Sequence, residues 1–454
     1  RKKQEGENER AKKGEEKNSK KKERKMRDSG IPWIGEVPEG WGMSPLKYNY
    51  NILAGATPDS TKQNFWDGNI KWITPADYKT KDVYVSFGKR NLTSAGYKAC
   101  STHMLPKGSI VISKRAPIGS VAITTSDLCT NQGCLGLVAK NKFVNNKYFY
   151  YVLSIYDDVL NLYGSGTTFK EISANVFSNI EFPSPSVTIQ NSIADFLDSK
   201  CSEIDTLIEN LCARVESAKE YKKAVITEAV TKGLDKDAKM KDSGVDWIGK
   251  IPEKWKVSRI GHDYNVTLGK MLDSKEYDQH EMNNYLCAAN IKWSGVNTSI
   301  NKKMKFSSSE KPLYLLQKGD VLIMEGGTAG TSCIYNNEFA PCYIQNSVHR
   351  CRAINNNISK YLYYWMHVVF YSGYINSICN KATILHYTKE KVEKTPIVLP
   401  SIVEQKSIVN YLDAKCSEID ALLQNYEDQI ATLEEYKKSL IYEYVTGKKE
   451  VPAA

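Results

Sequence analysis

Several features that mark other classes of protein are missing from this sequence. No apolar run of about 18 residues is present that would span a bilayer, and no basic, apolar and small-residue sequence typical of a secretory signal opens the chain. The eleven cysteines are scattered and include no Cys-x-x-Cys pair. This usage fits a reducing compartment better than a disulfide framework, so we expect a cytoplasmic protein.

Motifs for catalysis and metal binding are also missing. The sequence contains no Gly-rich cofactor loop, no Asn-Pro-Pro-Tyr methylation motif, and no serine-hydrolase or zincin motif. Cys342, His349 and Cys351 match no zinc spacing, and buried structural thiols explain them better. Pro58-Asp59 followed by Asp77-Tyr78-Lys79 resembles one nuclease pattern, but both pieces lie in turn-rich segments and chance explains them better. We expect a non-catalytic chain without a metal site.

The positive charge of the chain is unevenly distributed. Residues 1–25 hold twelve Lys or Arg and six Glu, so they supply +6 of the formal net charge of +10. This leader has no aromatic or large apolar residue with which to build a core, which predicts a disordered or weakly helical segment. The remaining chain is only mildly basic. A DNA-attracting arm is one interpretation of the leader, and a solvated tail is the better one.

The most informative feature is a long internal repeat. "MRDSGIPWIGEVPEGW" begins at Met26 and "MKDSGVDWIGKIPEKW" begins at Met240, a period too long for a solenoid unit. Each copy opens a stretch of short β-like runs and turns, then an aromatic helical patch at 146–153 or 359–366, then a proline-marked exit. The tryptophans of the entry phrase (Trp33, Trp41, Trp247 and Trp255) favour an aromatic anchor over a DNA-stacking role. The chain is therefore interpreted as two related halves.

Each half closes with a helix that has a narrow apolar seam. Apolar residues recur there at alternating steps of four and three, the a and d positions of a coiled coil. The first seam is Leu197, Cys201, Ile204, Ile208, Leu211 and Val215, and the second is Leu412, Cys416, Ile419, Leu423, Tyr426 and Ile430. A narrow stripe needs a covering partner, so we expect the two helices to pair, antiparallel, with both cysteines as small core residues.

The helices resemble one another more than the globular parts do. "FLDSKCSEIDTLI" and "YLDAKCSEIDALL" agree at nine of thirteen positions, whereas "LPKGSIVISKRAPIGSVAI" and "LQKGDVLIMEGGTAGTSCI" agree at six of nineteen. The shared residues of the globular parts are framework types, such as Gly108 with Gly319. Charged positions differ, as at Lys114-Arg115 against Glu325-Gly326. Two heads on one scaffold that bind different things would show this pattern.

At this point the chain resembles a known family, the specificity subunits of type I restriction-modification systems. The resemblance runs from about Met26 to the end and rests on the duplicated "DSGxxWIGxxPxxW" entry, the "ILAGATPDSTKQNFWDGNIKWITPADY" segment and the duplicated "LDxKCSEIDxL" helices. The second half keeps Gly269 and the "NIKW" of 290–293 but lacks the "TPxS" turn. Its contact loop is therefore the less certain of the two.

The resemblance implies a mixed α/β (α+β) fold. It implies two pseudo-two-fold-related target recognition domains separated by two long helices that pair as an antiparallel coiled coil. The expected segments are a leader at 1–25, the first recognition domain at 26–184, a spacer helix at 185–234, the second recognition domain at 235–401, a spacer helix at 402–448 and a tail at 449–454.

The resemblance also implies a function and partners. Each domain would read one half of a bipartite, interrupted site in double-stranded DNA. The helices would bind two modification subunits that use S-adenosylmethionine, and two restriction subunits that use ATP and Mg²⁺ would join optionally. This chain itself would carry no cofactor.

Residues that could contact DNA are Lys, Arg, Asn, Gln and Thr in or beside turns, because phosphates and base edges are bound by these side chains. In the first half they are Lys71, Lys79, Lys89, Arg90, Lys114, Arg115, Asn131, Gln132, Thr168 and Lys170, and in the second Lys270, Lys292, Lys302, Lys303, Lys305, Gln345, Asn346, Arg350 and Lys381. For any single one, a solvated surface side chain is about as good an interpretation. Gln132 and Gln345 align across the halves, which would also suit a structural hydrogen-bond bridge.

One further motif and one alternative function remain open. "GSGTTFKEI" at 164–172 resembles a phosphate cradle without the Gly-Lys-Ser/Thr ending of a nucleotide loop, which favours contact with DNA backbone over ATP binding. The alternative to a specificity subunit is a coiled-coil protein scaffold with only non-specific nucleic-acid contact. Sequence preference at physiological salt would separate the two.

Overall fold

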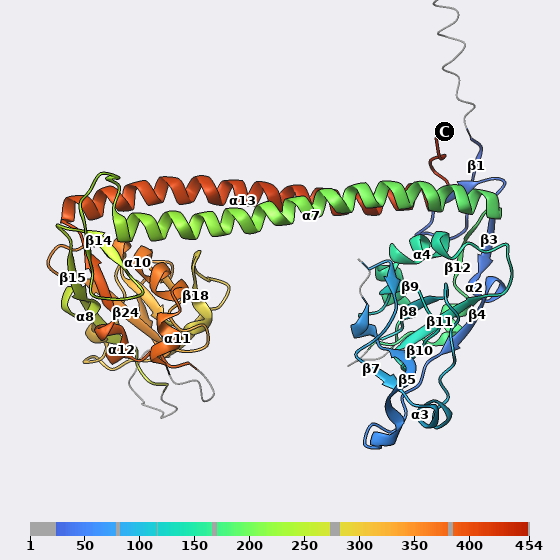
Figure 1. The fold of residues 1–454 in the computed structure, drawn as a ribbon, viewed down its shortest axis with the longest axis horizontal. Helices are drawn as coiled ribbons and strands as arrows, with labels where there is room; N and C mark the ends of the chain where they lie inside the picture. Colours follow the sequence, from blue (N-terminus) through green and yellow to red (C-terminus); the bar gives the residue numbers. More distant parts are fainter. Residues whose placement is uncertain are drawn as a thin grey trace, which may run out of the picture. The chain divides into compact units, whose positions relative to one another are not determined.

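The computed structural model describes residues 24–78, 82–115, 117–165, 170–272, 282–379 and 385–452. The chain divides into two compact units, the first formed by Arg1–Asn210 with Ile430–Ala454 and the second by Leu211–Gln429. Each unit has a mixed head of strands and short helices, and a part of each long helix, α7 (Val187–Lys232) and α13 (Ile402–Val445) (Figure 1). The predicted mixed fold with two long helices is confirmed.

The first head (residues 24–186) is built around a five-stranded sheet in the order β4-β11-β8-β9-β6. Its strands are β4 (Tyr50–Ala54), β11 (Cys134–Ala139), β8 (Ile110–Ser113), β9 (Val121–Thr124) and β6 (Tyr84–Val85), antiparallel except for β6 with β9. Every residue of β8 and β9 is buried. Ile110 and Ile112 join the core beneath the helix α4 (Asn146–Ser154), and Val111 joins a separate core on the opposite face. Because both faces are covered, these strands are apolar except for Ser113 and Thr124 at their ends.

A second, three-stranded sheet lies on that opposite face, in the order β10-β5-β7. Its strands are β10 (Cys129–Thr130), β5 (Trp66–Ile73) and β7 (Arg90–Leu92), accompanied by η1 (Gln63–Phe65), η2 (Pro75–Asp77) and α3 (Ser94–Lys98). The head is completed by the pairs β1 (Met26–Asp28) with β2 (Glu36–Pro38) and β3 (Gly42–Pro45) with β12 (Glu181–Ser184), and by α2 (Leu46–Asn49), α5 (Asp157–Tyr163) and α6 (Ala174–Ser178).

The second head (residues 233–401) repeats this plan. A four-stranded sheet β16-β24-β21-β22 and a three-stranded sheet β20-β17-β23 take the places of the two sheets above. The strands are β16 (Tyr264–Leu268), β24 (Val348–Ala353), β21 (Val321–Met324), β22 (Ser332–Ile334), β20 (Lys302–Lys305), β17 (Met282–Leu286) and β23 (Cys342–Ile344).

Shorter elements complete the second head. They are β13 (Met240–Asp242) with β14 (Lys250–Pro252), β15 (Lys256–Arg259) with β25 (Pro396–Leu399), β18 (Ile291–Lys292) with β19 (Gly295–Val296), and the helices α8 (Ile260–Asp263), η3 (Ala288–Asn290), α9 (Lys311–Tyr314), α10 (Ser359–Tyr371), α11 (Tyr374–Ile378) and α12 (Lys389–Lys394).

The entry phrases anchor each head to the end of a long helix. Trp41 is 3% exposed and shares a core with Ile441 and Val445 at the end of α13, and Trp255 is 2% exposed and shares a core with Val230 at the end of α7. The other tryptophans of the phrases also meet aromatic rings within their heads. The aromatic-anchor interpretation of these residues is confirmed.

The aromatic helices α4 and α10 hold the same helix ends by hydrogen bonds. The Tyr148 hydroxyl donates to the carbonyl oxygens of Pro183 and Val445, at 3.0 Å each. In the second unit the Tyr361 hydroxyl donates to Val398 at 2.9 Å and to Val230 at 3.2 Å. Each buried hydroxyl therefore satisfies a terminal helix carbonyl that has no partner within its own helix.

The long helices cover each other's seam within each unit. Every residue of the two predicted seams is buried or half-buried. In the first unit Phe196 meets Tyr444 and Asp205 meets Lys437, so the helix segments run antiparallel. Burial raises the pKa of the Cys201 thiol to about 11, as a core residue requires. Among the described residues, no helix is long and apolar enough to cross a membrane.

Two ion pairs fix the register of the helices. Lys437 Nζ lies 2.6 Å from Asp205 Oδ1 in the first unit, and Lys222 Nζ lies 2.6 Å from Asp420 Oδ1 in the second. Val215 and Ile430 are the last residues of the two predicted seams. Lys222 and Lys437 occupy the equivalent seam position one heptad later. A polar residue at a single seam position selects one register among several.

We predict that Lys222→Asp lowers the free energy of unfolding by about 1 kcal/mol, because a half-exposed attraction becomes a repulsion. Adding Asp420→Lys should restore most of that loss, as measured by urea denaturation. Lys219 is the matched control, since its ion pair is with Glu216 on its own helix. Equal rescue of Lys219→Asp by Asp420→Lys would show that the pair does not set the register.

Candidate nucleic-acid interface

Residues 52–78 of the first head, here called the Gly-rich segment, lie against the turn that follows β10. A Cβ on Gly55 would lie 2.2 Å from the Asn131 carbonyl oxygen, so only glycine allows the chain to pass there. The second head repeats this approach, where a Cβ on Gly269 would lie 2.4 Å from the Gln345 carbonyl oxygen. Gly55 and Gly269 therefore allow the same close approach in both heads, each between its own segment and the turn that carries Asn131 or Gln345.

The amides in these turns differ in exposure. Asn131 accepts the Gly133 amide at 2.9 Å and so closes its own turn. Gln132 is exposed and accepts the Thr57 hydroxyl. Gln345 is 8% exposed and accepts the Ser347 amide at 3.1 Å, while Asn346 accepts the Gln345 side-chain amide. Of the two aligned glutamines, Gln345 forms the structural bridge and Gln132 faces solvent.

Arg90 on β7 is the most distinctive cation of the first head. Its side chain is exposed, and its guanidinium carbon lies 3.8 Å from the ring centroid of Trp66. Trp66 is 4% exposed and meets Trp72 edge-on at 5.2 Å. The two indole N–H groups donate to Asp59 and Ala56, which fastens the Gly-rich segment to this aromatic pair.

Two other predicted DNA-contact residues near this sheet form hydrogen bonds within the head. Lys71 is half-buried and its Nζ donates to Ser126 Oγ at 2.8 Å. Lys89 is exposed, and its backbone amide donates to Asp77. Lys79 lies outside the residues that the structure describes.

The carboxylates of the nuclease-like pattern both complete turns. Asp59 accepts the Thr61 hydroxyl at 2.7 Å, and this bond is the main cause that lowers the pKa of Asp59. Asp77 accepts the Thr74 amide and hydroxyl, at 2.8 Å each. Within the described ranges no group of three or more His, Cys, Asp or Glu could hold a metal ion. These positions support the interpretation of the pattern as chance.

Cys342, His349 and Cys351 are core residues. All three are buried, and desolvation raises the pKa of Cys342 to about 12 and lowers that of His349 to about 4. His349 Nε2 lies 2.8 Å from the Tyr387 carbonyl oxygen. A neutral histidine among protonated thiols agrees with the structural interpretation.

The turn after β8 carries a pair of cations held by one carboxylate. Lys114 Nζ lies 2.7 Å and Arg115 Nε 2.8 Å from the Glu171 carboxylate. The bond from Lys114 is the largest cause that holds the pKa of Glu171 below its usual value. Lys170 beside it is exposed, and Thr168 lies outside the described residues. The two predicted cations are therefore already partly neutralised.

The second head carries an acid where the first carries a cation. Glu325 follows β21 as Lys114 follows β8, and its carboxylate lies 3.9 Å from His386 Nδ1. The Tyr387 amide donates to the Glu325 carbonyl just as the Ile172 amide donates to that of Lys114. Burial raises the pKa of Glu325. The same backbone junction thus carries opposite electrostatics in the two heads.

The predicted cations of the second head divide into exposed and buried groups. Lys292, Lys302 and Lys303 are exposed, and Lys305 is half-buried. Lys270 is 9% exposed, and its Nζ donates to Glu310 at 2.7 Å and to the Lys305 carbonyl at 3.0 Å. Lys381 lies outside the described residues. Lys270 therefore holds the fold of the head instead of facing solvent.

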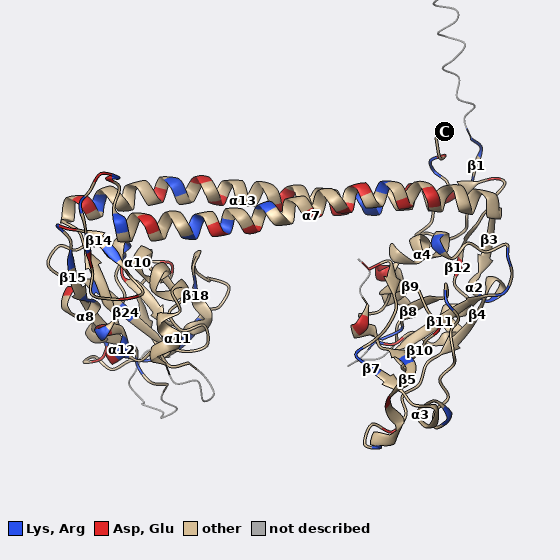
Figure 2. Ribbon diagram, in the orientation of Figure 1, with Lys and Arg blue, Asp and Glu red and all other residues tan. Residues whose placement is uncertain are grey.

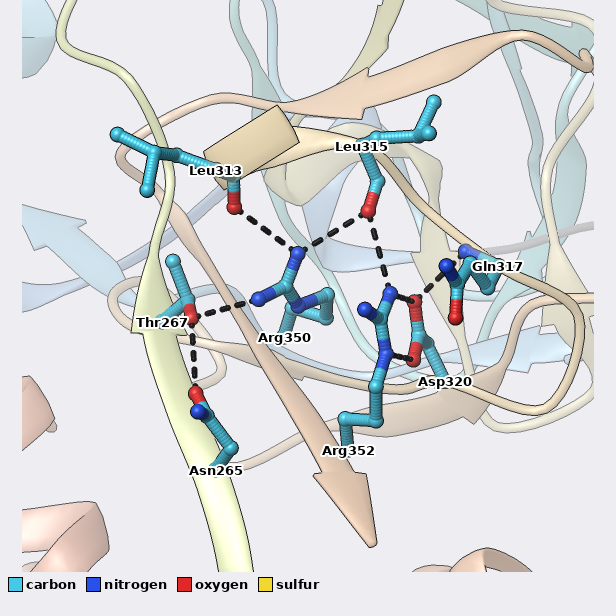
Figure 3. A network of polar contacts seen from close by, with 8 residues as sticks. All are labelled: Asn265, Thr267, Leu313, Leu315, Gln317, Asp320, Arg350 and Arg352. Carbon is cyan, nitrogen blue, oxygen red and sulfur yellow. Dashed lines mark hydrogen bonds and ion pairs between the residues drawn. The ribbon is translucent and has the colours of Figure 1, made fainter. Parts of the chain in front are cut away.

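Arg350 lies inside the second head, and its neighbour Arg352 forms a salt bridge there (Figure 3). Arg350 is 6% exposed and donates to the carbonyls of Leu313 and Leu315 at 2.9 and 3.0 Å and to Thr267 at 2.8 Å. Arg352 donates to both carboxylate oxygens of Asp320, at 2.8 and 2.7 Å. The sequence analysis grouped Arg350 with the turn cations and did not recognise Arg352 or Asp320.

We predict that Arg352→Ala lowers the free energy of unfolding by about 2 kcal/mol, because Asp320 is left buried without its cation. Asp320 is 2% exposed, whereas the Arg352 side chain is 33% exposed, which moderates the loss. Adding Asp320→Asn should recover part of it, as measured by urea denaturation. The control is Lys303→Ala, an exposed site where a change within about 0.5 kcal/mol is expected; a loss equal to that of Arg352→Ala would refute the assignment.

The geometry can now be compared with known proteins. The family model described as "Type I restriction modification DNA specificity domain" matches residues 38–217 and 252–432. The chain belongs to this family. The two matches fall one on each half of the internal repeat.

Curated relatives are named as specificity subunits of type I restriction enzymes. The chain is 32% identical over 249 residues to the type I restriction enzyme MjaIX specificity subunit of Methanocaldococcus jannaschii, covering 54% of this chain and 56% of that protein. It is 19% identical over 438 residues to the StySPI specificity subunit of Salmonella potsdam, covering 91% and 90%. The alignment with the MjaIX subunit thus spans little more than half of that relative.

Solved structures share the fold of this chain. One chain, from a study of complex assembly and conformational transition of the type I R-M system, matches with a TM-score of 0.69 at 16% identity, covering 91% of this chain and 99% of that one. The HsdS subunit from Thermoanaerobacter tengcongensis matches with a TM-score of 0.50 at 16% identity, covering 91% and 98%. At this identity the likeness concerns the fold alone.

Proposed function

We propose that this chain is the sequence-specific DNA-recognition subunit of a type I restriction-modification complex and that it reads a bipartite, interrupted site. One observation carries the proposal: two heads share a buried framework but differ in the charged groups at equivalent surface places. A framework that is kept while its exposed contacts change is what two half-sites of different sequence require. Family membership supports the same function.

Both heads carry Lys and Arg residues (Figure 2), and those with exposed side chains suit this task. Lys and Arg side chains bind phosphates, and arginine, lysine, asparagine and glutamine also reach base edges in the major groove. Arg90, Lys170 and Gln132 are exposed in the first head, and Lys292, Lys302 and Lys303 in the second. The chain would act without chemistry of its own, by holding partner enzymes at the site that it recognises.

The proposed partners supply the chemistry. Two modification subunits would bring S-adenosylmethionine to adenines in the target, and two restriction subunits would bring ATP and Mg²⁺. This chain would carry no cofactor and would work in the cytoplasm with the DNA.

The first test is sequence preference in the presence of salt. At about 150 mM salt, phosphate contacts alone give weak binding without sequence preference, whereas base contacts retain it. We expect the complex of this chain with its modification subunits to protect two short DNA segments with an unprotected gap between them in a nuclease footprint. Binding to all duplexes with equal affinity at that salt would instead support a scaffold with non-specific contact.

The second test exchanges one head. Residues 42–184 begin and end on the antiparallel pair β3 and β12, where Gly42 lies opposite Ser184, so a graft there joins adjacent chain ends. We predict that replacing this segment by the corresponding segment of a relative changes one half of the methylated motif and leaves the other unchanged. The matched control replaces residues 256–399, bounded by the equivalent pair β15 and β25. Methylation mapping by sequencing measures both, and a change in both halves from one graft would refute independent heads.

A further inference from the structure

We propose that Arg90 in the first head and Lys302 in the second occupy one equivalent base-reading position, and that Arg90 recognises a guanine through the major groove. The inference rests on the proposed function and adds to it a named residue and a base. It comes from the strand registers of the two three-stranded sheets and from the contacts of the Arg90 side chain.

The registers place the two cations at the same point. Arg90 on β7 lies opposite Trp72 on β5, and Trp72 lies beside Cys129 on the parallel strand β10. Lys302 on β20 lies opposite Tyr285 on β17, and Tyr285 lies beside Tyr343 on the parallel strand β23. The Asn131 amide donates to the Ile73 carbonyl just as the Gln345 amide donates to that of Leu286, which aligns Trp72 with Tyr285. The position is therefore defined by the sheet and not only by alignment of the sequences.

The position lies on an edge strand in both heads. β7 is the last strand in the order β10-β5-β7, and β20 is the first in the order β20-β17-β23. The B-DNA major groove admits a two-stranded β-ribbon, and β5 with β7, or β17 with β20, forms such an antiparallel pair at one side of each three-stranded sheet. An exposed side chain on the edge strand of such a ribbon would meet base edges before the inner strands do.

The contacts of Arg90 suit base recognition better than those of the other predicted cations. Its guanidinium stacks on Trp66, a contact that orients the planar group without using its N–H donors. In the described part of the chain, no carboxylate forms an ion pair with Arg90, whereas Arg115 is held by Glu171 and Lys71 donates to Ser126. An oriented guanidinium with free donors matches the paired acceptors O6 and N7 of guanine.

The second head offers a different group at this position. Lys302 is exposed and carries a single point charge instead of a planar fork. Its neighbour across the strands is Tyr285, which is 7% exposed. The two heads would consequently prefer different bases at the equivalent point, as two unlike half-sites demand.

The test uses the full chain in complex with its modification subunits and selects bound duplexes from a library of randomised double-stranded DNA. Arg90→Lys keeps the positive charge but loses the fork and the stacking, so it separates base recognition from phosphate binding. We expect it to reduce the preference for guanine at one position of one half-site by about tenfold or more. The other half-site should be unchanged, which also reports that the complex is folded.

Lys98→Gln is the matched control, because Lys98 is an exposed cation on α3 of the same head. It should weaken binding evenly across sequences or leave it unchanged. Lys302→Ala should alter preference at one position of the opposite half-site. An unchanged guanine preference in Arg90→Lys, or an even loss across all sequences, would overturn the assignment of Arg90. A wild-type complex that selects no sequence would instead refute the proposed function.

Discussion

The mutual covering of two narrow apolar stripes is the interaction on which the rest of this structure depends. Neither α7 nor α13 has enough apolar surface to form a core alone, and each unit buries a part of both. An antiparallel pair with a single register follows, because Asp205 on α7 meets Lys437 on α13 and Asp420 on α13 meets Lys222 on α7. Each helix supplies the acid of one pair and the base of the other. A slip of one heptad would separate both pairs at once.

The heads depend on the helices in the same reciprocal way. The first head binds the end of α13 through Trp41 and Tyr148, and the second binds the end of α7 through Trp255 and Tyr361. These aromatic groups satisfy helix carbonyls and fill the space beside them, so the entry phrases cannot change freely. Residues on surfaces far from the helix ends do not pack against the helices or bind their carbonyls. Charge can therefore reverse between Lys114–Glu171 and Glu325–His386 while the backbone hydrogen bond beneath stays the same.

The sequence was sufficient to predict features that depend on local periodicity. The heptad steps identified both seams, and the Trp and Pro spacing identified the anchors. The predicted first seam ended at Val215 because the seam position one heptad later is Lys222, yet apolar contacts continue to Val230. In the sequence alone, a lysine at a seam position looks like the end of the coiled coil. The structure shows that the seam continues, because Asp420 on the opposite helix pairs with Lys222.

Burial of individual polar side chains could not be predicted in this way. Arg350 and Lys303 are both cations on short strands of the second head, but Arg350 points into the space between two sheets and Lys303 lies on an edge. Whether such a cation is buried or exposed depends on which strands become neighbours in the fold, and a single sequence does not give that information. Lys270 and Gln345 follow the same logic, since their partners Glu310 and Ser347 become close only through the fold.

The way in which a surface cation is held decides what it can do next. Arg115 is held by a carboxylate, so it must exchange one charge-assisted hydrogen bond for another before it reaches a DNA phosphate. Arg90 is held by the face of an indole ring, and that contact leaves its hydrogen-bond donors unused. For Arg115, the free energy gained by binding a phosphate is offset by the loss of its bond to Glu171, so it contributes only to sequence-independent attraction. For Arg90, the orientation of the guanidinium and its free N–H donors are both kept, and oriented donors are what distinguish one base edge from another.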